Sequence, residues 1–80
     1  MLDYKTLELQ YPKFPMLQPD IGICRYMQQV IKQKVYSSYI EQYCIGMLKF
    51  ILNENNQKYK AELKILMEIY DILNKKEIKN

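Results

Sequence analysis

Side chains that carry catalysis or metal binding are sparse in this sequence of 80 residues. It contains no histidine, so the commonest general base and metal ligand is missing. Its two cysteines, Cys24 and Cys44, lack the close spacing of a metal-binding or redox pair. With only two glycines, the chain has no glycine-rich loop to cradle a phosphate group. These residue types predict a protein that is not an enzyme and that holds no metal or cofactor.

The two cysteines are expected to be free thiols. If they lie on antiparallel helices that meet at Ser37 and Ser38, their axial offset is roughly 10 Å. A disulfide needs Cα atoms within roughly 7 Å, so this offset excludes the bond. The N-terminal residues include Asp3 and Glu8 and lack the apolar core of a secretory signal. Reduced thiols without such a signal predict an intracellular protein, with the compartment left open.

Length and composition predict one small folded domain. Eighty residues suffice for one domain but not for two. Apolar residues make up 49% of the chain, too many for a disordered protein. No run of about 18 apolar residues occurs, so no transmembrane segment is expected.

The sequence from residue 21 onward predicts an all-α fold, a three-helix bundle with helices at about 21–36, 39–53 and 56–76. Apolar residues of the first helix recur at the spacing of one helical face: Ile23, Cys24, Met27, Val30, Ile31 and Val35. The third helix has a similar stripe: Tyr59, Leu63, Leu66, Met67, Tyr70 and Leu73. Asn53 and Asn56 flank the turn between the last two helices, because asparagine tolerates left-handed backbone geometry.

The boundary between the first two helices is less sharply marked. Ser38 and Glu41 have the spacing of a capping box, in which each side chain satisfies a backbone amide of the other residue. This spacing favours a new helix near residue 39. The alternative is one continuous helix from 21 to 53 that passes through both serines.

Residues 1–20 are expected to form an extended N-terminal arm that precedes the helical bundle of residues 21–80. The arm holds all three prolines, and these prevent residues 11–19 from forming a helix: Pro12, Pro15 and Pro19. Before them, Leu7, Leu9 and Tyr11 alternate with polar residues, which is the period of a strand.

The second predicted helix is apolar on nearly every side. Its polar residues form only a narrow stripe: Gln42, Gly46, Lys49 and Asn53. Such a helix normally lies at the centre of a large core, which a bundle of three helices cannot provide. Its excess apolar surface must be covered by the arm, by a second copy of the chain or by another protein. Whether the arm docks on its own helices or on a partner stays open.

These features predict a non-catalytic helical protein–protein interaction module, such as a small accessory subunit or adaptor of a larger complex. Its partner is expected to be a larger complex or a second copy of the chain. Aromatic and methionine side chains provide large contact areas at low entropic cost. The expected contact residues are Tyr11, Phe14, Met16 and Leu17 in the arm, and Tyr39, Tyr43, Met47 and Phe50 in the second helix.

Two alternative functions remain. The first is a small nucleic-acid-associated protein that contacts phosphates through Arg25, Lys32, Lys34 and Lys49. A pI of about 8.8 is only mildly basic for such a role. The second is a peripheral membrane-binding protein that uses the amphipathic second helix, with its lysine facing the headgroups.

Overall fold

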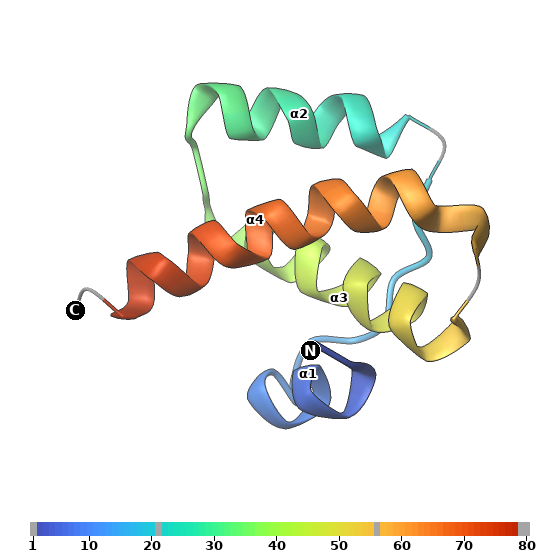
Figure 1. The fold of residues 1–80 in the computed structure, drawn as a ribbon. Helices are drawn as coiled ribbons and strands as arrows, with labels where there is room; N and C mark the ends of the chain where they lie inside the picture. Colours follow the sequence, from blue (N-terminus) through green and yellow to red (C-terminus); the bar gives the residue numbers. More distant parts are fainter. Residues whose placement is uncertain (1, 21, 56, 79–80) are drawn as a thin grey trace.

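The protein is all-helical in a computed structural model that describes residues 2–20, 22–55 and 57–78 (Figure 1). The α-helices in this part of the chain are α1 (Tyr4–Gln10), α2 (Ile23–Gln33), α3 (Ser38–Glu54) and α4 (Lys60–Ile78). A short 3₁₀ turn, η1 (Gln57–Tyr59), precedes α4. No strand occurs among the described residues. The all-α class is therefore confirmed, whereas the expected count of three helices becomes four.

The three longer helices correspond to the three predicted ones and run in alternating directions (Figure 1). The predicted helix starts at residues 21 and 56 lie outside the described residues. A break does separate the first two helices, because Lys34 adopts a left-handed conformation with φ 59° directly after α2. Ser37, not Ser38, caps α3, and its hydroxyl accepts a hydrogen bond from the amide of Ile40 at 3.3 Å.

The prediction of an extended arm is wrong for residues 4–10, which form helix α1. The Asp3 carboxylate caps this helix by accepting a hydrogen bond from the Thr6 amide at 2.9 Å, and this bond lowers the pKa of Asp3. Leu7 is fully buried against the rest of the core. A helix of seven residues is too short to be stable in isolation, so its packing on α3 holds it in place.

Residues 11–19 are non-helical, as the prolines require. This segment crosses α3, and the Leu17 amide donates a hydrogen bond to the Gly46 carbonyl at 3.0 Å. A Cβ atom on Gly46 would lie only 2.6 Å from the carbonyl oxygen of Pro15, so a larger residue at this position would displace the segment. Glycine in α3 is thus required by the close approach of the arm.

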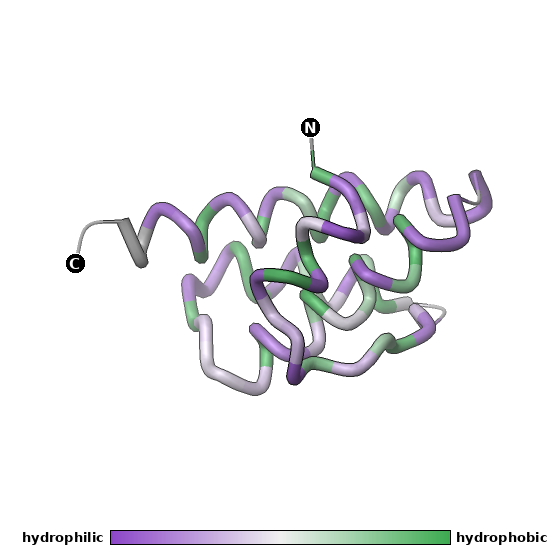
Figure 2. Tube along the Cα trace, turned by 90° about the horizontal axis from the view of Figure 1, so that it is seen from below, coloured by the Kyte–Doolittle hydropathy of each residue, from purple (hydrophilic) through white to green (hydrophobic). Residues whose placement is uncertain are grey.

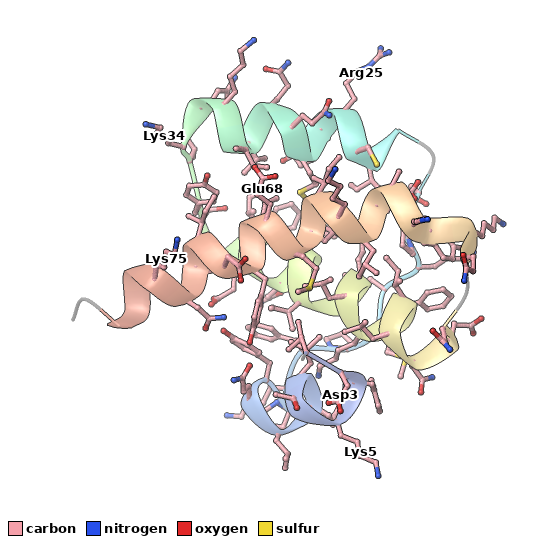
Figure 3. All side chains as sticks on the ribbon, in the orientation of Figure 1. Asp3, Lys5, Arg25, Lys34, Glu68 and Lys75 are labelled. Atoms are coloured by element: carbon pink, nitrogen blue, oxygen red, sulfur yellow. The ribbon has the colours of Figure 1, made fainter. Side chains whose placement is uncertain are left out.

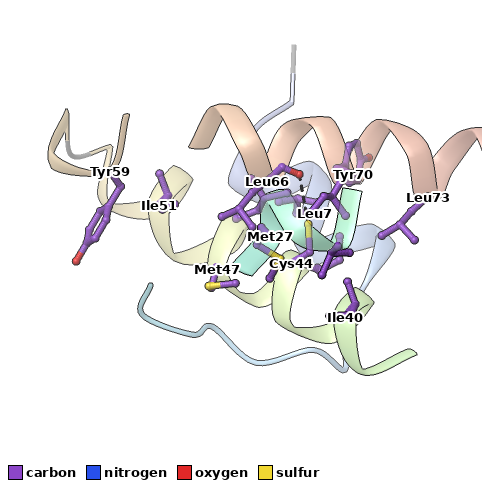
Figure 4. Packing of buried hydrophobic residues seen from close by; sticks show 14 residues of the cluster. Leu7, Met27, Ile40, Cys44, Met47, Ile51, Tyr59, Leu66, Tyr70 and Leu73 are labelled. Atoms are coloured by element: carbon purple, nitrogen blue, oxygen red, sulfur yellow. Dashed lines mark hydrogen bonds between the residues drawn. The ribbon is translucent and has the colours of Figure 1, made fainter. Parts of the chain in front are cut away.

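Helices α3 and α4 form the centre of the fold. Helix α1 packs on α3, and α2 packs on α4 (Figure 1). The buried cluster draws on all four helices and η1, and the Cys44 thiol within it donates a hydrogen bond to the Leu66 carbonyl at 3.3 Å (Figure 4). Hydrophobic residues recur at intervals along each helix (Figure 2). Among the described residues, no helix combines the length and apolarity needed to cross a membrane.

Candidate interaction surface

The chain itself covers most of α3. Its buried residues include Ile40, Cys44, Ile45, Met47, Leu48 and Ile51. Helix α1 covers one side, α4 covers another, and the segment after α1 crosses Gly46. Of the three covers that the sequence allowed for this helix, the fold therefore uses the N-terminal residues of the chain itself. The arm takes the role of an internal cover, which sequence reasoning had left open beside the partner alternative.

The predicted contact residues do not form one exposed surface. Met47 is buried, and five others are half-buried and pack against the core: Tyr11, Phe14, Leu17, Tyr43 and Phe50. Tyr11 stacks on Phe14 with ring centroids 5.4 Å apart, and Phe50 meets Tyr59 edge-on. Of the eight, Met16 and Tyr39 are classed as exposed, with 38% and 59% of their surfaces accessible.

Lys49 is buried, with only 1% of its surface accessible, and holds the arm against α3. Its ammonium group donates hydrogen bonds to the carbonyl oxygens of Tyr11 and Phe14, the latter at 2.6 Å. It also forms an ion pair with the Glu8 carboxylate at 3.1 Å. A lysine ammonium has three N–H donors, and three acceptors surround this one. Lys49 is therefore occupied inside the fold and does not reach an external phosphate or lipid headgroup.

The other three basic residues of the nucleic-acid alternative are exposed. Arg25 and Lys32 lie on α2, and Lys34 follows its last residue. Figure 3 shows Arg25 and Lys34 at opposite ends of α2, with both side chains directed away from the rest of the protein. No acidic residue occurs between Asp20 and Glu41, so this helix carries only positive charge.

A groove at the junction of α2 and α3 gathers most of the exposed apolar side chains. Tyr26, Val35 and Tyr39 line it with accessible fractions of 49%, 60% and 59%. The buried residues Val30 and Ile40 also line it, and its volume is about 270 Å³. Among the described residues, the other large exposed hydrophobic side chains are Leu9 and Met16, neither of which lines the groove. This groove, here called the α2–α3 groove, therefore holds three of the five large hydrophobic side chains that are exposed among the described residues.

Local backbone geometry creates the α2–α3 groove. Tyr26, Gln29 and Gln33 follow one another at i, i+3 and i+7, so they share one face of α2. The left-handed turn at Lys34 then ends the helix and places Val35 at the groove instead of in the core. A continued helix would have carried Val35 onto the apolar face to which the periodicity assigned it.

Tyr39, on the α3 side of the groove, is paired with Tyr43. The Tyr39 hydroxyl donates a hydrogen bond to the Tyr43 hydroxyl at 3.0 Å, and the rings meet edge-on with centroids 4.7 Å apart. This hydrogen bond raises the pKa of Tyr39, so its hydroxyl stays neutral in ordinary buffers. Sequence reasoning selected both tyrosines but missed Tyr26 and Val35, because neither stands out until the helix ending is known.

The thiols are poor nucleophiles in this fold. Cys24 and Cys44 are both free, as the axial offset predicted. Burial raises the pKa of Cys44 to about 12, with a smaller contribution from the charge of Glu41. Burial also raises the pKa of Cys24, and Glu62 adds to that shift. The described residues contain no group of three histidine, cysteine, aspartate or glutamate side chains placed to hold a metal ion.

A second hollow lies between the end of the arm and the start of α4. It has a volume of about 590 Å³ and is lined by Gln18, Pro19, Asp20, Lys58, Tyr59 and Glu62. Its lining mixes both signs of charge and includes no histidine or cysteine.

Fold and surface together define a small all-helical protein with a self-covered central helix and an apolar groove beside a basic helix. No known protein family, curated protein or solved structure matches the chain. The functional proposal therefore rests on the residues of the groove.

Proposed function

We propose that the chain is a non-catalytic protein-interaction module, a small accessory subunit or adaptor, that binds its partner through the α2–α3 groove. The observation that carries this proposal is the gathering of Tyr26, Val35 and Tyr39 around one hollow, each at least about half exposed. Clustered exposed apolar side chains on a folded protein are typical of interaction sites, and tyrosine is enriched among residues that dominate binding energy.

The groove is small, with a volume of about 270 Å³. A hollow of this size accommodates one or two side chains of another protein. We include an intracellular location in the proposal, because Cys24 and Cys44 are free thiols and fit a reducing compartment.

The test compares two polar substitutions in affinity enrichment from the native source, followed by quantitative mass spectrometry. Val35→Gln makes the groove polar without a change of charge. Leu9→Gln makes the same type of change on α1, at a side chain that is 84% exposed and does not line the groove. Both positions are exposed, so both variants should fold like the parent, which circular dichroism checks.

The expected result is a set of proteins that the parent and Leu9→Gln enrich equally and that Val35→Gln loses. Equal enrichment by all three proteins would contradict the proposal. Loss with Leu9→Gln alone would move the interaction surface to α1.

A further inference from the structure

The chemistry around the groove identifies the kind of segment that fits it, an inference that rests on the proposed function. We propose that the α2–α3 groove binds a protein segment with one apolar side chain in the hollow and acidic residues on both sides of it. The acidic residue on one side would pair with Arg25, and those on the other side with Lys32 and Lys34. The partner is thus defined by an apolar anchor with flanking carboxylates.

The charged residues beside the α2 wall of the groove are positive, whereas Glu41 follows Ile40 on the α3 side. None of the residues that line it is acidic, and the chain from residue 21 to residue 40 contains no aspartate or glutamate. Arg25 directly precedes Tyr26, the first α2 residue of the groove, and Lys34 directly follows Gln33, the last one. Along α2, the cations therefore lie at both ends of the row of lining residues, and acidic residues on both sides of an apolar anchor complement this row.

The spacing of the cations sets the spacing expected in the partner. Arg25 and Lys34 are nine positions apart, so a rise of about 1.5 Å per residue separates them by roughly 13 Å along the axis of α2. An extended segment advances about 3.3 Å per residue, so its acidic residues should be about four positions apart. Gln29 and Gln33 line the hollow between them with side-chain amides that can bond to the backbone of such a segment.

Other occupants fit these observations less well. A symmetric dimer through this groove would bring two acid-free basic helices together, which like-charge repulsion opposes. A nucleic acid would meet three exposed cations around an apolar hollow, and Lys49 is unavailable to it. An anionic membrane would meet the same three charges, without the longer polybasic cluster that holds such surfaces.

The experiment selects peptides from a displayed library of random dodecapeptides against the full chain. Enriched sequences should contain an aromatic or large aliphatic residue with an acidic residue on each side. Binding of the synthetic peptides, measured by fluorescence anisotropy, should weaken about tenfold in Val35→Gln, as expected when a central contact is lost. Rising salt should weaken it further, because exposed charge pairs are screened.

A charge-matched pair of triple variants isolates the role of the cations. Arg25→Gln, Lys32→Gln and Lys34→Asn together remove the bracketing charges, and asparagine tolerates the left-handed backbone at position 34. Lys5→Gln, Lys64→Gln and Lys75→Gln remove three exposed charges elsewhere. The first set should weaken peptide binding by about 10- to 100-fold at low salt, at roughly two- to fivefold per pair, and the second by less than about twofold.

Each contrary result has a distinct meaning. Peptides that lack acidic residues but still require Val35 would overturn this inference and leave the proposed function standing. Peptides insensitive to Val35→Gln, or no enriched peptide, would overturn both. Binding of phosphatidylserine vesicles or a DNA oligonucleotide that the first triple variant alone abolishes would assign the basic helix to that ligand. A dimer in light scattering that Val35→Gln dissociates would make a second copy the occupant.

Discussion

Replacement of Lys49 by methionine should strongly destabilise the fold. The Lys49 ammonium group joins α3 to the carbonyl oxygens of Tyr11 and Phe14 and to the Glu8 carboxylate. Methionine keeps most of the apolar stem and fits the space, but it removes all three donor interactions at once. The two carbonyl groups then lose their charged donor in a partly buried setting.

The expected decrease in the free energy of unfolding follows from the hydrogen bond or ion pair that each acceptor of Lys49 loses. A buried polar group left without its partner costs about 1–3 kcal/mol, and two carbonyl groups are affected here. Glu8 is 45% exposed, so its carboxylate regains water and adds at most about 1 kcal/mol. Partial hydration of the loosened arm offsets some of this cost. We expect the free energy of unfolding to fall by about 2–4 kcal/mol, which for a domain of this size lowers Tm by about 10–25 °C.

Urea denaturation followed by circular dichroism measures the effect. Lys64→Met serves as the control, because Lys64 is exposed on α4 and its substitution should change the free energy of unfolding by no more than about 0.5 kcal/mol. Glu8→Gln should cost no more than about 1 kcal/mol. A Lys49→Met variant within about 1 kcal/mol of the parent, with an unchanged m value, would refute the role of Lys49 as the residue that holds the arm.

Three further predictions concern the same core. Gly46→Ala should lower the free energy of unfolding by about 1–3 kcal/mol, because its Cβ would lie 2.6 Å from the Pro15 carbonyl oxygen, and a stabilised variant in urea denaturation would contradict that approach. Cys44 should resist alkylation near neutral pH until the protein unfolds, as mass spectrometry can detect. Because its folded-state pKa is raised from 9.0 to about 12, stability should fall as pH rises between these values, and fall less in Cys44→Ala. Deletion of residues 2–18 should lower Tm well below that of the full chain, and an unchanged Tm would show that the arm is dispensable.

The periodicity of apolar residues predicted the three longer helices, because each is long enough for its buried apolar stripe to repeat over several turns. The apolar residues of α2 and α4 repeat over at least three turns, and the prolines mark residues 11–19 as non-helical. Helix α1 was not predicted because it has fewer than two turns. So short a segment does not show whether its apolar residues repeat with the period of a helix or of a strand. The available signal was Asp3, three residues before Thr6, which is the spacing of a cap.

The burial of Lys49 could not be predicted from local sequence. In the helical pattern it occupies a polar stripe with Gln42 and Asn53, both of which are exposed. Its partners Tyr11 and Phe14 are 38 and 35 positions away, so no short motif connects them. Only the path of the arm across α3 shows that the lysine satisfies backbone carbonyl groups instead of facing water.

The covered central helix also changes where a partner can bind. Sequence reasoning placed the contact residues on the arm and on the apolar second helix, and left open whether the arm itself covers that helix. With α1 and the arm in place, the enclosed faces of that helix are no longer available, and displacement of the arm would break the contacts of Lys49. Part of the remaining apolar surface depends on the left-handed turn at Lys34, which takes Val35 off the core face and places it at a hollow with Tyr26 and Tyr39. Lysine is not a residue whose presence predicts a left-handed turn. The groove is therefore recognised only in the three-dimensional fold.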